Sequence, residues 1–175
     1  MTIERLQVER LAIIGVMGSG VDAHEDLARP LGRWIAHEGH HLLTGGGKGV
    51  MTAVSRAFTE VTPRRGLTIG VLPDPEGREG YPNPYVEIPI RTHLPLSGAN
   101  GTGPDSRNPI NVLTADVVIA LPGGPGTRSE VELSIRYARP LRLFGPAERF
   151  ALFAAAERVD TLDELAAFVR AHVPR

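Results

Sequence analysis

The residues best suited to chemistry lie in one short stretch of the chain, between Leu121 and Arg136. An apolar run, DVVIAL, ends there at a turn rich in proline and glycine, and a helix-favouring run follows the turn. Glycines let the backbone approach a ligand closely, and the first amides of a helix have no partner inside it. Those amides and the helix dipole favour an anion, usually a phosphate. The sequence therefore predicts a ligand-binding turn that consists of Pro122, Gly123, Gly124, Gly126 and Thr127.

Glu130 follows this turn and allows two interpretations. Thr127 and Glu130 have the T-x-x-E spacing of a capping box, in which the glutamate only closes the start of a helix. A capping box requires neither Pro122 nor the glycines, however, so it explains the pair without explaining the turn. The alternative is that the Glu130 carboxylate acts on a ligand bound at the turn.

Two further glycine turns follow apolar runs that read as buried strands. The run from Leu11 to Val16 leads to Gly18 and Ser19, and the run from His40 to Thr44 leads to a second turn. We expect both turns to contact the ligand, the second through Gly45, Gly46, Gly47, Lys48 and Gly49. The first lacks the G-x-G-x-x-G spacing of dinucleotide sites, and the second lacks the Ser or Thr that follows the lysine of a Walker A loop. NAD binding and nucleoside triphosphate hydrolysis are therefore disfavoured.

The repeated order of strand, glycine turn and helix predicts the fold. It indicates an α/β, Rossmann-like, doubly wound and mainly parallel sheet with helices on both faces, in one domain over residues 1–175. Strands are expected at 67–72, 85–91, 116–121 and 140–144 besides the two above, and helices at 50–61, 146–158 and 161–172. Another helix is expected at 22–38, with an irregular first half because of Pro30 and Gly32. In such sheets ligands bind beyond the carboxyl ends of the strands, where all three glycine turns would lie.

A long loop-like segment, from Leu94 to Asn111, precedes the last of these strand and turn units. Structureless inserts of this length are uncommon in compact domains and often form lids or binding loops. Arg107 lies near its end and could hold phosphate or sugar oxygens with its planar donor fork, or form an ordinary surface ion pair.

The composition narrows the possible classes. The chain has 175 residues, 42% apolar residues and a formal charge of -1, so we expect no nucleic-acid or membrane partner and a cytoplasmic location. Cysteine is absent and the six histidines lack ligand spacing, so we expect no metal site. Lys48 is the single lysine and lies in a glycine turn, which disfavours Schiff-base chemistry. No cofactor is expected.

Two segments resemble one known family. PGGPGTRSE matches the PGGxGTxxE motif of the LONELY GUY proteins, and TGGGKGVMTAV is similar to their GGGxxGLM element. This family is part of a lysine decarboxylase-like superfamily, and its members are cytokinin-activating phosphoribohydrolases. The resemblance implies hydrolysis of a nucleoside 5'-monophosphate to free base and ribose 5-phosphate, with Glu130 and Arg107 as catalytic residues. It also implies a homodimer.

The sequence departs from this family beside Arg107. The family enzymes usually have Arg-Lys at this place, whereas this chain has Arg107-Asn108-Pro109, which looks more like the branch of molybdenum cofactor carriers. The alternative function is therefore a non-enzymatic protein that binds or carries a nucleotide or a phosphorylated pterin. In that case the same glycine turns would hold the ligand.

Overall fold

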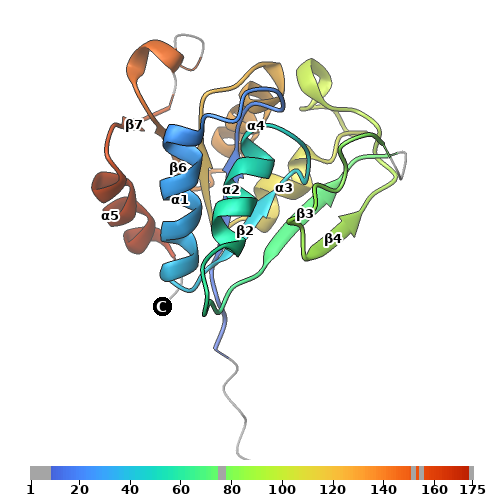
Figure 1. Cartoon of the computed structure of the whole chain (residues 1–175). Coiled ribbons are helices and arrows are strands. Elements are labelled where there is room, and N and C mark those ends of the chain that lie inside the picture. Colours follow the sequence, from blue (N-terminus) through green and yellow to red (C-terminus); the bar gives the residue numbers. More distant parts are fainter. Residues whose placement is uncertain (1–8, 75–77, 151–152, 154–155, 174–175) are drawn as a thin grey trace, which may run out of the picture.

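The chain forms one seven-stranded parallel sheet with helices on both faces (Figure 1). The computed structural model describes residues 9–74, 78–150, 153 and 156–173. The strand order is β4-β3-β2-β1-β5-β6-β7, and every neighbouring pair is parallel. The predicted Rossmann-like α/β fold is confirmed. The strands are β1 Ile13–Met17, β2 His41–Thr44, β3 Thr68–Leu72, β4 Ile88–Arg91, β5 Val117–Ala120, β6 Leu141–Phe144 and β7 Arg158–Val159.

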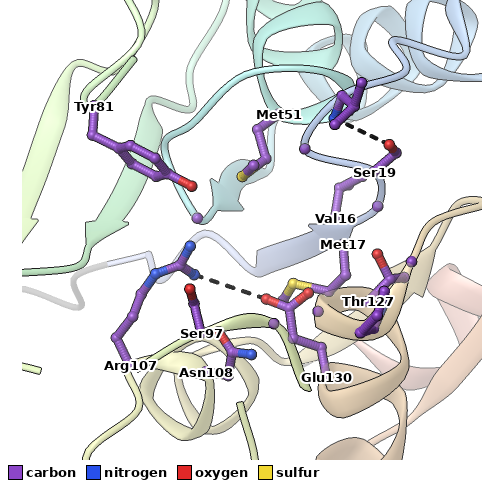
Figure 2. A pocket seen from close by; sticks show the side chains of 18 residues that line it. Val16, Met17, Ser19, Met51, Tyr81, Ser97, Arg107, Asn108, Thr127 and Glu130 are labelled. Atoms are coloured by element: carbon purple, nitrogen blue, oxygen red, sulfur yellow. Dashed lines mark hydrogen bonds and ion pairs between the residues drawn. The ribbon is translucent and has the colours of Figure 1, made fainter. Parts of the chain in front are cut away.

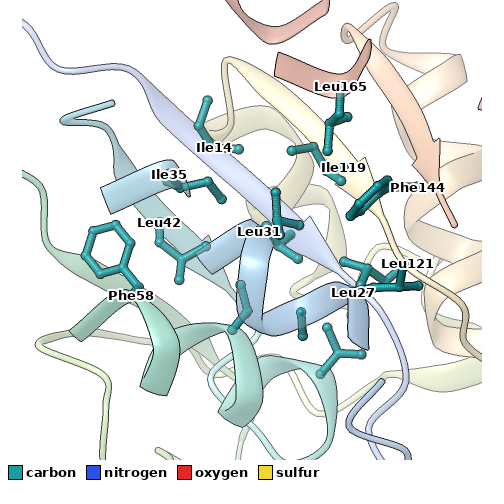
Figure 3. Packing of buried hydrophobic residues seen from close by; sticks show 14 of the residues in the cluster. Ile14, Leu27, Leu31, Ile35, Leu42, Phe58, Ile119, Leu121, Phe144 and Leu165 are labelled. Atoms are coloured by element: carbon teal, nitrogen blue, oxygen red, sulfur yellow. The ribbon is translucent and has the colours of Figure 1, made fainter. Parts of the chain in front are cut away.

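The helices form two layers, one on each side of the sheet. They are α1 Glu25–His37, α2 Val50–Thr59, α3 Asn108–Thr114, α4 Pro125–Arg136 and α5 Leu162–His172, with short 3-10 helices η1 Gly98–Asn100 and η2 Ala147–Phe150. Side chains alternate across each strand, so Ile14 and Val16 pack under α1, α2 and α5 (Figure 3), whereas Met17 packs on the opposite face with Val131 of α4. This double layer explains why the strands are apolar almost throughout.

The order in which the chain adds strands to the sheet reverses at β1. This strand pairs with β2 on one side and with β5 on the other. The turns that follow β1 and β5 therefore emerge side by side, and the Ser19 amide donates a 3.1 Å hydrogen bond to the Pro122 carbonyl. Doubly wound sheets bind ligands in the crevice at such a point. The fold thus brings two of the three glycine turns into contact.

The first helix is more regular than the sequence predicts. It begins at Glu25 and continues without interruption to His37, with Pro30 inside it. Pro30 is exposed, so the carbonyl that it leaves without a donor can be hydrated. A Cβ at Gly32 would overlap the Val54 carbonyl oxygen, so this glycine permits the close contact between α1 and α2.

The helix predicted at 146–158 is wrong for the part of this segment that the structure describes. Only η2 is helical, and hydrogen bonds such as Phe153 N to Phe150 O close single turns. Arg158 and Val159 instead pair with β6 as the edge strand β7. Packing of Phe150 and Phe153 against the sheet and pairing of β7 override the helical propensity of the segment. Residues 151, 152, 154 and 155 lie outside the described residues.

Candidate functional site

A cavity of about 270 Å³ opens beyond the carboxyl ends of β1 and β5 (Figure 2). Segments that are distant in the sequence line it together: the turn after β1, the beginning of α3, the beginning of α4 and single residues of the two loops after β2 and β3. Its charged lining residues are Arg107 and Glu130. The lining also includes Val16, Met17, Gly18, Ser19, Gly20, Val21, Gly45, Met51, Tyr81, Ser97, Gly98, Asn108, Gly124, Pro125, Gly126 and Thr127.

The beginning of α4 has free donors that face this cavity. Gly124 is the N-cap residue, and no side chain caps the helix. The first hydrogen bond of the helix runs from Arg128 N to Gly124 O, which leaves the amides of Gly126 and Thr127 without a partner inside it. A Cβ at Gly124 would have no atom within 4 Å, so a ligand can approach the backbone there.

Thr127 and Glu130 do not form a capping box. Pro125 is the first residue of α4, so Thr127 lies inside the first turn and Glu130 lies a turn further on. The Thr127 hydroxyl is buried and makes no hydrogen bond. The alternative in which Glu130 only closes the helix is therefore wrong, and the side chains of both residues are left to line the cavity.

The Ser19 hydroxyl can donate a hydrogen bond to a ligand in the cavity. Its Oγ accepts hydrogen bonds from the amides of Val21, at 3.1 Å, and Asp22, at 2.9 Å. Because both lone pairs of the oxygen are used, the hydroxyl can only donate to a ligand. Ser19 therefore favours an acceptor such as a phosphate oxygen.

Arg107 is the most unusual residue of the cavity. Its side chain is only 5% exposed, and its Nε and NH1 atoms are buried without a hydrogen-bond partner in the part of the chain that the structure describes. The nearest carboxylate oxygen is Oε1 of Glu130, 3.8 Å from NH1, a distance too long for a hydrogen bond. The surface ion pair considered for Arg107 is therefore wrong. Because buried donors are almost always paired in proteins, these vacant donors point to a ligand.

Glu130 lies between Arg107 and the beginning of α4 (Figure 2). Its side chain is 10% exposed, and its Oε1 accepts a 3.1 Å hydrogen bond from Nδ2 of Asn111. Burial raises the pKa of Glu130 above its ordinary value, and the positive charge of Arg107 and the Asn111 hydrogen bond oppose this increase only in part. An acidic group with a raised pKa in a cavity is typical of functional sites.

Most of the second glycine turn supports the cavity wall from behind. Among its five residues, Gly45 alone lines the cavity. A Cβ at Gly45 would overlap the Arg107 guanidinium, one at Gly46 would meet Leu72, and one at Gly47 would lie 2.6 Å from Cζ of Tyr81. These glycines therefore provide room for side chains of the protein.

Four other predicted residues also lie outside the cavity lining. Lys48 is exposed and forms a 2.6 Å ion pair with Glu79. Gly49 has a φ of 63° and contacts the backbone of Ser19. Pro122 and Gly123 shape the turn after β5. The Pro122 carbonyl accepts the hydrogen bond from the Ser19 amide. Gly123 leaves room for Thr127, because a Cβ at this position would overlap the Thr127 hydroxyl oxygen.

The structure adds residues that the sequence analysis missed. Asn108 and Asn111 are buried, and Asn111 lies one helical turn after Arg107, a spacing that could have indicated a shared face of α3. Tyr81 reaches the cavity from a loop without periodicity (Figure 2), so no sequence signal marks it. Its loop is attached to the second glycine turn by a 2.9 Å bond from Asn83 to the Gly47 carbonyl.

A comparison with protein families decides the identity of the chain. The model of the SLOG cluster4 family matches residues 11–169. The chain belongs to the SLOG cluster4 family. An uncharacterized protein of Archaeoglobus fulgidus is 30% identical to this SLOG cluster4 protein over 139 residues, which are 78% of this chain and 82% of that protein.

Solved structures of molybdenum cofactor proteins are similar to this SLOG cluster4 protein. The molybdenum cofactor binding protein from Rippkaea orientalis has a TM-score of 0.75 and 34% identity, covering 94% of this chain and 98% of that one. A Moco carrier protein from Chlamydomonas reinhardtii has a TM-score of 0.71 and 34% identity, with coverages of 93% and 97%. The chain is thus similar to the carrier branch of the superfamily. A specific place among the LONELY GUY enzymes stays a prediction.

No helix in the described ranges is long and apolar enough to cross a membrane. Within the same ranges, no group of three or more histidine, aspartate or glutamate side chains could hold a metal ion.

Proposed function

We propose that this SLOG cluster4 protein binds a phosphorylated small molecule in the cavity, with the phosphate at the beginning of α4. The observation that carries the proposal is the buried Arg107, whose Nε and NH1 donors have no hydrogen-bond partner among the described residues and whose side chain lines a cavity with further free donors. The amides of Gly126 and Thr127 and the Ser19 hydroxyl suit phosphate oxygens. The arginine would hold other oxygens of the ligand with its planar fork.

We propose a phosphorylated pterin of the molybdenum cofactor type as the ligand, with the protein acting as a carrier. Two structures named as molybdenum cofactor proteins are similar to this chain at 34% identity over more than nine tenths of its length. Asn108, which follows Arg107 where the LONELY GUY enzymes usually have lysine, is buried and lines the cavity. A neutral amide there can bind a polar ring edge, because it offers both a donor and an acceptor.

A second candidate function is hydrolysis of a nucleoside 5'-monophosphate, and the position of Glu130 favours it. The Oε2 atom of this carboxylate makes no hydrogen bond among the described residues, and Glu130 lines the cavity, so this oxygen is available to a ligand there. In this reaction Glu130 would activate water, whose oxygen forms a bond to the anomeric carbon while the bond to the base breaks. The base takes up a proton and leaves, and ribose 5-phosphate remains. The ionised carboxylate would also stabilise positive charge on the sugar.

Binding measurements test the shared proposal first. Isothermal titration with AMP, ribose 5-phosphate and inorganic phosphate should show binding that Arg107→Ala weakens, by about 10-fold or more if a charge-assisted hydrogen bond is lost. For the carrier function, protein mixed with released molybdenum cofactor should elute from gel filtration with stoichiometric molybdenum and pterin. Absence of binding to all of these ligands would contradict the proposal.

Release of free base separates the two candidates. The wild type is incubated with a panel of nucleoside monophosphates, and Glu130→Gln is the matched variant. If the protein is an enzyme, Glu130→Gln should abolish base release and keep the Kd for AMP within a few-fold, because the amide keeps the shape and loses the charge. Bound molybdenum cofactor without base release by the wild type would support the carrier and exclude the hydrolase.

A further inference from the structure

The two oxygens of Glu130 have different surroundings. Oε1 accepts the 3.1 Å hydrogen bond from Asn111 and is also the oxygen 3.8 Å from Arg107. Oε2 has no hydrogen bond among the described residues, and the Glu130 side chain lines the cavity. The carboxylate is therefore held from one side by α3 and is open on the other.

We propose that Asn111 is a positioning residue that fixes Oε1 of Glu130 and thereby presents Oε2 to the bound ligand. Asn111 is fully buried and does not line the cavity, so it acts through Glu130 rather than on the ligand itself. Its place on α3, one turn after Arg107, lets a single short helix set both groups against the carboxylate. The proposal rests on the proposed ligand site in this cavity.

A purely structural role explains Asn111 poorly. Its Oδ1 is buried without a donor, and a buried acceptor without a partner destabilises a fold, whereas an apolar side chain of similar size would avoid this cost. An amide is useful here because its Nδ2 donates a hydrogen bond to the ionised carboxylate, which an apolar side chain could not do.

The charged group that faces Glu130 is Arg107, which lies directly before α3. The neutral neighbours that line the cavity with it are Asn108 of α3, Thr127 of α4 and Met17 of β1. Burial raises the pKa of the Glu130 carboxyl, while Arg107 and Asn111 lower it. Loss of the Asn111 hydrogen bond should therefore raise the pKa of Glu130 further.

The test is a titration of the full chain without ligand. The glutamate carboxyl carbons are labelled with ¹³C, and NMR spectra are recorded from acid to neutral pH. Glu130→Gln identifies the Glu130 signal by its loss. Asn111→Leu should move the titration midpoint of Glu130 to higher pH, because the donor that stabilises the ionised form is gone. Leu67→Ala, at an exposed position outside the cavity lining, serves as the control and should leave the midpoint unchanged.

Asn111→Ser keeps a donor and provides a second variant in case Asn111→Leu does not fold. It should give a midpoint between those of the wild type and Asn111→Leu. Unchanged midpoints in folded Asn111 variants, checked by circular dichroism, would overturn the proposal. The titration requires no ligand, so its outcome is independent of the binding measurements. A wild type that binds no phosphorylated ligand would contradict the proposed function instead.

Discussion

At the scale of single residues, the cavity is marked by polar atoms without partners. Buried polar groups are nearly always hydrogen-bonded, yet Arg107, Asn111 and Thr127 each have a buried atom that is not. All three side chains lie in or directly behind the same cavity wall. Such a concentration of unpaired groups destabilises the free protein, and a ligand that pairs with Arg107 and Thr127 would offset part of this cost.

Gly45→Ala is expected to weaken ligand binding through Arg107. The new Cβ would lie 2.8 Å from Cζ of Arg107, so the guanidinium must move away from its place beside Glu130. We expect the Kd for AMP or phosphate to increase by about 10-fold or more, as for the loss of a charge-assisted hydrogen bond. Isothermal titration provides the measurement. Gly103→Ala, whose Cβ would lie 3.3 Å from the nearest atom and outside the cavity, is the control.

Glu130→Gln is expected to change how stability depends on pH. The folded protein holds the Glu130 proton more tightly than the unfolded chain, because burial raises the pKa of this carboxyl above its ordinary value of 4.5. Binding of this proton therefore stabilises the folded wild type at low pH. This contribution to the free energy of unfolding is lost as the pH rises from about 4.5 through the raised pKa. Glutamine has no such proton. Urea unfolding between pH 4 and 8 should show the stability of Glu130→Gln increasing relative to wild type with pH, and a constant difference would contradict the assignment.

At the scale of elements, two helices with the same T-x-x-E pattern begin in different ways. At α5, Thr161 is the N-cap residue and forms a complete capping box with Glu164. At α4, Pro125 sets the first turn two residues before Thr127, so the pattern falls inside the helix. The position of proline therefore decides whether the threonine caps the helix or faces the cavity.

A matched pair of variants tests this difference. Thr161→Ala should reduce the free energy of unfolding by about 1 kcal/mol, because it removes the cap, and should leave ligand binding unchanged. Thr127→Val should weaken binding of a phosphorylated ligand and preserve stability, because its hydroxyl has no partner in the fold. Urea unfolding and isothermal titration on both variants provide the comparison. The reverse result would place the phosphate away from α4.

At the scale of the whole molecule, large apolar side chains are exposed at the ends of two neighbouring helices. Leu113 of α3, Ile135 of α4 and Tyr137 directly after α4 are large side chains that are 39–49% exposed. Helices α3 and α4 pack side by side on the same face of the sheet (Figure 1), and Arg139 donates a 2.7 Å hydrogen bond to the Leu113 carbonyl. Exposed apolar groups on neighbouring helices are typical of a protein interface.

We expect this surface to form the homodimer that the resemblance implies. Ile135→Glu should convert the dimer to a monomer, since a charge would be buried at the interface. Light scattering after size-exclusion chromatography measures the mass. Val21→Glu, at a position in the turn after β1 that is 88% exposed, should keep the mass of the wild type. A monomeric wild type would contradict this expectation.

The sequence by itself determined the layered fold and the glycine turn at the beginning of α4. Apolar runs, glycine turns and helix-favouring segments are local signals, so the sheet, the turn at Gly124 to Thr127 and the capping box of α5 could be predicted from them. Tertiary structure decided what each glycine accommodates and which polar atoms lack partners. Gly45 makes room for Arg107, which lies 62 residues later, and Asn111 holds Glu130 from another helix. Helix 146–158 was predicted wrongly for the same reason, since contacts between distant residues outweigh local propensity.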